Sequence, residues 1–177
     1  AVAVADADGD GDEDLFLAQN DFGLRPHLPR LDAGVGLWLE GDGHGGFLTV
    51  PPSRSGVRLY GEQRGAAVSD FDGDGRLDLV VTQNGADTVL FRNRQARPGL
   101  RVRLAGPAAN PAGVGARVRL SSGAGPAREV RLGSGGRSQD SLVLVVARPD
   151  PVTALSVNWP GTGVREYRIE ASVTEAI

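Results

Sequence analysis

Several residue types are missing from this sequence of 177 residues, and each absence excludes a kind of site. There is no cysteine, which excludes disulfides, zinc–thiolate sites and thiol nucleophiles. Cysteine content therefore does not indicate whether the protein is in an oxidising or a reducing compartment. There is no methionine either, including position 1, so we expect a piece of a longer protein whose N-terminal part, with any signal peptide, lies upstream. The longest apolar run, residues 142–147, is far shorter than the ~20 residues of a membrane helix.

Lysine is also absent, and all 19 basic residues are arginines. The acidic residues gather in the first half of the chain and the arginines in the second, although the net charge is only −3. A basic half can indicate nucleic-acid binding. Here the arginines alternate with apolar residues, as in residues 100–104 and 116–120, which is the pattern of a strand with one solvent-exposed face. We therefore expect no nucleic-acid partner and no membrane insertion of this segment.

The sequence does contain an internal repeat. Residues 3–15 (AVADADGDGDEDL) recur 64 positions later as residues 67–79 (AVSDFDGDGRLDL). Between residues 1–20 and 65–84, 11 of 20 positions are identical. In each copy an apolar strand is expected to enter an Asp/Gly-rich loop and a second strand to leave it. The repeat thus predicts two copies of one supersecondary unit.

Short strands separated by turns are expected along the whole chain, because 26 glycines and 11 prolines punctuate it and no segment keeps a helical period. The expected strands are 1–5, 15–18, 36–39, 47–50, 66–69, 77–82, 88–92, 100–104, 116–120, 127–132, 141–146, 154–159 and 164–169. They predict an all-β fold: a partial β-propeller of about two blades in residues 1–95, then a small β-sandwich or barrel-like domain in residues 98–177. Since a propeller ring has about four to eight blades, we expect the missing ones upstream.

Both Asp/Gly loops follow the pattern D-x-D-x-D-G-x-x-D, with carboxylates at loop positions 1, 3, 5 and 9. Calcium takes about 6–8 oxygen ligands, and alternate spacing lets side chains converge within a tight turn. Glycine at position 6 permits that turn, and position 7 is expected to offer its backbone carbonyl. The sequence predicts two structural Ca²⁺ sites. Their ligands would be Asp6, Asp8, Asp10, Asp12 and Asp14 in the first loop, and Asp70, Asp72, Asp74, Arg76 and Asp78 in the second.

An EF-hand and a metal-free turn are the alternatives to this kind of calcium loop. An EF-hand loop starts in the same way but needs a bidentate Glu at position 12 and flanking helices. Here Leu17 and Val81 occupy position 12, within expected strands. A metal-free turn is the remaining alternative, since Asp and Gly both favour turns. However, four or more carboxylates within nine residues repel one another unless a cation screens them, which favours calcium.

The sequence offers little material for catalysis. The two histidines, His27 and His44, stand in Pro- and Gly-rich segments, and residues 133–136 lack the flanking pattern of a nucleophile elbow. Residues 41–46 match a dinucleotide fingerprint as a string, but they precede an expected strand and are predicted to form a hairpin. We therefore expect a protein that is not an enzyme, with no catalytic residues and no cofactor besides the metal.

The Asp/Gly repeats and their flanking strands resemble the FG-GAP/VCBS blades of integrin-α-like propellers. Residues 61–67 (GEQRGAA) and 90–93 (LFRN) also resemble segments beside such repeats. In that family the loop joins the first two strands of a blade and binds calcium. The resemblance places the side-chain ligands at positions 1, 3, 5 and 9 of both loops and makes Asp12 and Arg76 carbonyl donors.

The C-terminal part resembles the ASPIC/UnbV domain, which often follows such blades. The matching stretches are 100–104 (LRVRL), 110–117 (NPAGVGAR), 128–130 (REV), 133–135 (GSG), 138–139 (SQ) and 157–160 (VNWP). The family's Phe-Gly-Leu-Gly segment is not recognisable, and residues 145–149 stand near its place.

The two resemblances imply an exported protein, secreted or at the cell surface, that acts in adhesion or as a scaffold for an extracellular protein or glycan. Two alternatives stay open. The first is an accessory or catalytic module of a secreted polysaccharide-acting enzyme. The second is a spacer domain without a ligand of its own.

Overall fold

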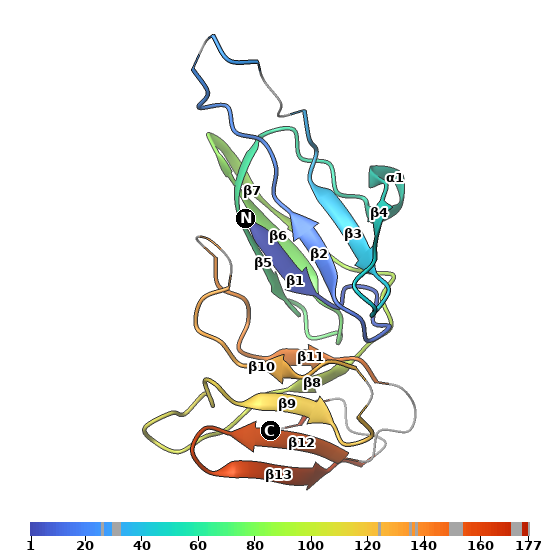
Figure 1. Ribbon diagram of the computed structural model, residues 1–177, viewed down its shortest axis with the longest axis vertical. Coiled ribbons are helices and arrows are strands. Elements are labelled where there is room, and N and C mark those ends of the chain that lie inside the picture. Colours follow the sequence, from blue (N-terminus) through green and yellow to red (C-terminus); the bar gives the residue numbers. More distant parts are fainter. Residues whose placement is uncertain are drawn as a thin grey trace.

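A computed structural model of the chain describes residues 1–25, 27–29, 33–123, 125–134, 136, 138–148, 154–170 and 175–176. Parts of the stretches 133–135 and 145–149, quoted above for the C-terminal resemblance, lie outside these residues. Within them the chain is nearly all β, which confirms the predicted fold class (Figure 1). The helix α1 (Pro52–Ser55) is a single turn. No helix among the described residues is long and apolar enough to cross a membrane.

The first repeat forms a four-stranded antiparallel sheet in the order β1-β2-β3-β4. The strands are β1 (Val2–Ala5), β2 (Asp14–Leu17), β3 (Leu37–Gly41) and β4 (Phe47–Val50). Alternation along β1 places Ala3 and Ala5 on the buried face, where Phe16 pairs with Ala3 and is fully enclosed. The predicted hairpin joins β3 to β4.

The second repeat forms a three-stranded antiparallel sheet in the order β5-β6-β7. The strands are β5 (Glu62–Ser69), β6 (Asp78–Asn84) and β7 (Ala86–Phe91). Ala66, Val68, Leu79 and Val81 point to one face of this sheet and share a hydrophobic core with the buried face of the first sheet. The two sheets therefore stack like consecutive blades.

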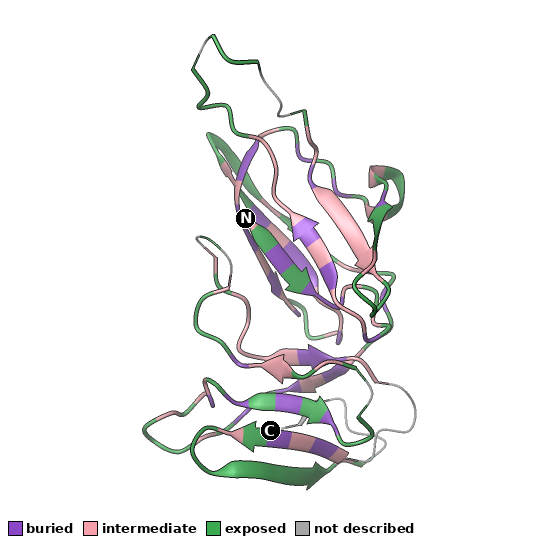
Figure 2. Ribbon diagram, in the orientation of Figure 1, coloured by how far each residue is buried: buried purple, intermediate pink, exposed green. Residues whose placement is uncertain are grey.

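The stacking is head to tail, because opposite faces of the two equivalent sheets meet. At the repeat offset, Ala66 and Val68 correspond to Val2 and Val4. The pair on β5 is buried between the sheets, whereas Val2 and Val4 are exposed and give β1 its alternating bands in Figure 2. The same sequence positions thus have a packing partner in one repeat and face outward in the other.

Residues from β8 onward form a second unit with its own core. The strands are β8 (Leu100–Val102), β9 (Arg117–Leu120), β10 (Arg128–Glu129), β11 (Leu144–Val146), β12 (Ala154–Trp159), β13 (Gly163–Arg168) and β14 (Glu175–Ala176). They make two sheets, in the orders β10-β9-β12-β13 and β11-β8-β14, around buried Leu100, Val118 and Leu155. The sequence did not predict β14, which pairs in parallel with β8.

The second unit contacts the first at the end that carries both Asp/Gly loops (Figure 1). The connecting segment lies on the two loops: Arg97 N donates to Asp8 O at 2.9 Å, and Gly99 N donates to Gly75 O at 2.8 Å. This arrangement brings two loops that are far apart in the sequence against one short piece of chain.

The second unit also covers part of the free edge of β5. Val68 N donates to Asp140 Oδ1 at 2.9 Å, and Ser141 N donates to Val68 O at 3.1 Å. Since an open strand edge is a template for pairing with other strands, these two bonds protect part of β5, which is an edge strand in the described sheet.

Candidate metal centre

Each Asp/Gly loop starts and ends at a buried aspartate. Asp6 and Asp14 bound the first loop, and Asp70 and Asp78 bound the second; none of the four is more than 8% exposed. A buried carboxylate is stable only if hydrogen bonds or an opposite charge replace its lost hydration. The loops supply such partners largely from their own backbone.

The aspartate at position 1 organises the turn. Asp6 Oδ1 accepts a hydrogen bond from Gly9 N at 2.8 Å, and its Oδ2 accepts one from Gly11 N at 3.1 Å. Asp70 binds the two equivalent glycine N–H groups, at 2.9 Å each. Gly9 and Gly11 have φ values of 77° and 103°, which glycine adopts without strain. The local sequence therefore dictates how the chain curls around this carboxylate.

The aspartate at position 9 connects the loop to its sheet. Asp14 Oδ2 accepts from Ala7 N at 2.8 Å, and its Oδ1 accepts from Gly41 N at the end of β3 at 2.9 Å. Asp78 accepts in the same way from the N–H of the second loop position at 3.0 Å and from Asn93 N at 2.8 Å. The two loops thus have the same hydrogen-bonded frame.

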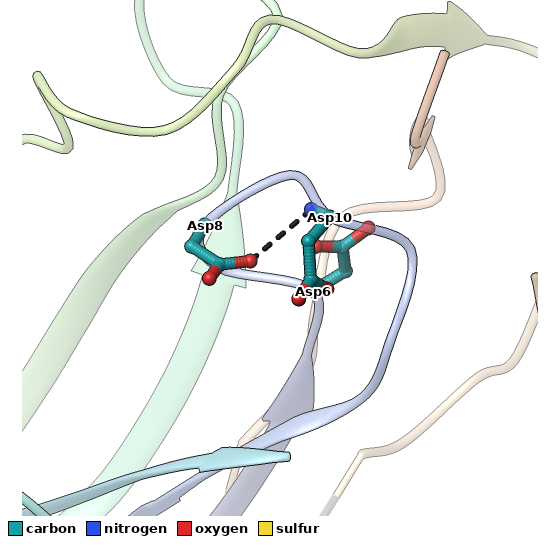
Figure 3. A group of neighbouring side chains, drawn as sticks. All are labelled: Asp6, Asp8 and Asp10. Atoms are coloured by element: carbon teal, nitrogen blue, oxygen red, sulfur yellow. Dashed lines mark hydrogen bonds between the residues drawn. The ribbon is translucent and has the colours of Figure 1, made fainter. Parts of the chain in front are cut away.

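Three carboxylates of the first loop converge. Asp6, Asp8 and Asp10 place oxygens within 4.8 Å of one another (Figure 3). Asp8 Oδ1 accepts from Asp10 N at 3.1 Å, and Asp10 Oδ1 accepts from Asp12 N at 2.8 Å, so the loop's own backbone positions them. Hard oxygen donors at this spacing suit Ca²⁺, and each carboxylate oxygen that accepts one N–H keeps a second lone pair for a metal.

Burial raises the pKa values of carboxyl groups in this loop. It raises the pKa of Asp6 to about 6, although nearby Arg128 opposes the change, and that of Asp14 to about 6 against its backbone donors. The pKa of Asp8 is also raised, first by partial burial and then by the charge of Asp10. Ionised carboxylates are therefore costly here at neutral pH, and a bound cation would remove that cost.

In the second loop the converging group is different. It consists of Asp70, Asp72 and Asp78, again with oxygens within 4.8 Å. Asp74 does not join it, because its Oδ2 pairs with Arg76 Nη1 at 2.9 Å and its Oδ1 accepts from Arg76 N at 3.0 Å. Arg76 at position 7 is thus the ion-pair partner of Asp74 at position 5.

The structure therefore brings together six of the predicted ligands in two groups of three. The other four predicted residues, which lie outside these groups, are Asp12, Asp14, Asp74 and Arg76. Asp14 has the loop-closing role described above. Metal ligation by all ten residues, including carbonyl donation by Asp12 and Arg76, stays a prediction.

Sequence reasoning missed two arginines of the second unit that reach the loops. On β8, Arg101 Nε lies 2.8 Å from Asp70 Oδ2. On β10, Arg128 Nη1 donates to both Glu13 carboxylate oxygens at 2.6 and 2.5 Å, and its Nη2 lies 3.6 Å from Asp6 Oδ2. Alternation indicated only that these arginines stand on the polar face of a strand. The spacing of residues within a strand does not predict which distant acidic residue an arginine will contact.

Asn93 was missed as a bridge between the loops. Its Nδ2 donates to Ala7 O in the first loop at 2.5 Å and to Leu77 O in the second at 3.2 Å. The available signal was its position at the end of the 90–93 segment, directly after the last strand of the repeat.

A cleft of about 550 Å³ opens beside the first loop. Its lining mixes aromatic and charged side chains, including Trp38, Phe91, Asp8, Glu40 and Arg94. Trp38 is half-buried, and its ring packs at a tilt against Phe16 with a centroid separation of 5.7 Å. Concave surfaces of this mixed character are common binding sites.

The comparison with protein families agrees with the repeat. A family model described as an FG-GAP-like repeat matches residues 6–81, from position 1 of the first loop into β6, so it covers both Asp/Gly loops. No curated protein matches the chain. The chain thus contains an FG-GAP-like repeat in an all-β fold, which indicates a β-propeller-like extracellular module. The resemblance of residues 98–177 to ASPIC/UnbV stays a prediction.

Proposed function

We propose that the chain is an extracellular calcium-binding module without catalytic activity, secreted or held at the cell surface. Ca²⁺ stabilises its Asp/Gly loops, and the propeller-like sheets present a surface to a protein or glycan partner. The observation that carries the proposal is the convergence of Asp6, Asp8 and Asp10 around a backbone frame that recurs at the second loop. The FG-GAP-like repeat supports it, since such repeats often bind Ca²⁺.

The role of the metal follows from the position of the loops. Ca²⁺ would be held by Asp6, Asp8 and Asp10 in the first loop and by Asp70, Asp72 and Asp78 in the second. Bound there, it would offset the repulsion between carboxylates in loops that also contact the connecting segment and the second unit. The metal is thus structural. At a free concentration about tenfold above Kd, each site would add about 1.4 kcal/mol of stability.

The cleft beside the first loop supports a binding role. Asp8 belongs to the converging group and also lines the cleft, so calcium in the loop would fix one wall of it. Trp38 and Phe91 offer apolar contact area, and Glu40 and Arg94 offer polar contacts. This combination suits an exposed protein segment or a glycan, both of which pair apolar patches with hydrogen-bonding groups.

Calcium titration of the folded chain tests the proposal. Calorimetry with CaCl₂, with circular dichroism run alongside, is expected to give binding at both sites and, about tenfold above Kd, a melting temperature higher by about 6–11 °C. The double variant Asp6→Asn with Asp70→Asn is expected to lose both effects. Asp87→Asn, an exposed carboxylate on β7 near the turn that joins it to β6, is the matched control and is expected to change neither.

Two results would contradict the proposal. If the folded chain binds no Ca²⁺, the Asp/Gly loops are metal-free turns. Cleavage of polysaccharide by the purified chain, lost on substitution of the loop aspartates, would make the protein an enzyme.

A further inference from the structure

The two loops share a hydrogen-bonded frame but differ in charge. The first loop carries six carboxylates between positions 1 and 9, and no arginine. The second loop carries four carboxylates and Arg76 over the same positions. The aspartates at positions 1, 3, 5 and 9 are the same in both loops, so the difference in charge comes from Asp12 and Glu13 in the first loop against Arg76 and Leu77 in the second.

Arginines accompany three of the four aspartates of the second loop. The pairs are Asp70 with Arg101 (Oδ2–Nε, 2.8 Å), Asp72 with Arg92, and Asp74 with Arg76 (Oδ2–Nη1, 2.9 Å). The three arginines come from different elements: the loop itself, the residue after β7, and β8 of the second unit. The Asp70 side chain is 1% exposed, so its pair with Arg101 is shielded from water.

Arginines contact the converging carboxylates of the first loop less closely. Arg128 forms ion pairs with this loop, and Arg54 acts electrostatically on Asp8. The guanidinium of Arg128 lies at 2.5 Å from Glu13, which is not one of the converging carboxylates, and at 3.6 Å from Asp6. Asp8 and Asp10 are held by backbone N–H groups, which add no net charge.

We infer that Arg76, Arg92 and Arg101 act as built-in counter-cations of the second loop, so that the first loop binds Ca²⁺ more tightly than the second. The inference rests on the proposed calcium binding and ranks the two sites. A fixed positive charge near a carboxylate repels a divalent cation that enters the loop. In addition, Asp74 can reach a metal only after it leaves Arg76, whereas its equivalent Asp10 already stands within the converging group.

The difference is measurable with a matched pair of single-loop variants. Asp8→Asn disables the first loop and Asp72→Asn disables the second; both are exposed position-3 carboxylates, so both variants are expected to fold. Each is titrated with CaCl₂ by calorimetry near physiological ionic strength, after a melting curve has confirmed folding. Asp72→Asn is expected to bind about tenfold more tightly than Asp8→Asn, since several arginine charges act on one divalent ion in a water-like dielectric.

The counter-cation role has its own test in the Asp8→Asn background. Adding Arg92→Ala is expected to tighten binding at the second loop by about fivefold, because it removes one partly exposed positive charge. Arg165→Ala is the control and should leave the affinity unchanged. This exposed arginine belongs to β13, and β13 lies on the side of the second unit away from the first unit (Figure 1).

The outcomes separate this inference from the proposed function. Equal affinities for the two single-loop variants, or tighter binding by Asp8→Asn, would overturn the inference while leaving calcium binding in place. Unchanged or weaker binding after Arg92→Ala would overturn the counter-cation role. A folded wild-type chain that binds no Ca²⁺ would overturn the proposed function, and this inference with it.

Discussion

Val2 and Val4 of the first repeat are 44% and 50% exposed, whereas the equivalent Ala66 and Val68 of the second repeat are 2% and 7% exposed. The strands are alike, and this face of the second strand packs against the first sheet. The loops differ in a similar way, since three aspartates of the second loop pair with arginines, whereas at the first loop Arg128 pairs with Glu13 and lies farther from Asp6. A repeated sequence thus specifies local geometry, while packing partners elsewhere in the chain decide burial and charge.

The largest effect is expected where the two sheets meet. Phe16 is fully buried between them, so Phe16→Ala should lower the free energy of unfolding by about 3–5 kcal/mol through lost burial and a cavity. Its equivalent in the second repeat, Val80, is half-buried on the other face of its sheet, and Val80→Ala should cost only about 1 kcal/mol. Urea denaturation of both variants measures the difference. Equal losses would mean that the two faces pack equally well.

A smaller effect is expected at the contact between the units. Arg101→Ala leaves Asp70 with its backbone donors but removes the charged partner of this buried carboxylate, and should cost about 2 kcal/mol without calcium. Arg128→Ala leaves Asp6 with its backbone donors and removes the pair with the partly exposed Glu13, so it should cost about 1 kcal/mol. Thermal melts in EDTA compare them. A larger loss for Arg128→Ala would reverse the assigned order of the two contacts.

Acidification should act on the first loop. The folded-state pKa values of Asp6 and Asp14 are raised from 3.8 to about 6, so the folded state binds more protons than the unfolded state between these values. Without calcium these two groups therefore lower stability as the pH rises from about 4 to 6. Calcium must displace the same protons, so its stabilising effect should be full at pH 7.5 and largely lost at pH 5. Melting curves with and without CaCl₂ at both pH values test this, and an equal calcium effect at both would contradict it.

The smallest effect is expected on the exposed face of β1. Val4→Thr should change stability by no more than about 0.5 kcal/mol, because this side chain is half in water. Val68→Thr, at the equivalent buried position, should cost about 1–2 kcal/mol, since it places a hydroxyl in the core. Equal losses in a urea titration would show that another surface covers Val4 in solution.

Local pattern was enough to predict much of the fold. The strand at 47–50 and its hairpin occur where alternation and glycines indicated them, because both depend on neighbouring residues. The Asp/Gly loops form for the same reason: Asp6 needs only N–H groups up to Gly11. At the candidate site, position 5 behaved differently in the two repeats. Position 7 is an aspartate in the first loop (Asp12) and an arginine in the second (Arg76). The arginine pairs with Asp74 at position 5, so Asp74 stays out of the converging group.

Long-range pairing could not be predicted. The contact between Arg128 and Glu13 spans 115 positions, and the parallel pairing of β14 with β8 joins the two ends of the second unit. Such contacts depend on how finished sheets dock, which no short window of sequence contains. The same holds for Asn93, whose side chain joins two loops that only the stacked sheets bring together.

The hydrogen bonds that Asp140 and Ser141 make to the edge of β5 matter for the design of shorter fragments of the protein. The segment that joins the units is hydrogen-bonded to both loops, so a cut there would uncover the β5 edge and remove Arg101 and Arg128 at the same time. An expressed fragment ending before residue 96 would then combine an open strand edge with unbalanced acidic loops, and we expect it to self-associate or require calcium to stay in solution. Fragments for crystallisation or binding assays should therefore keep the two units together.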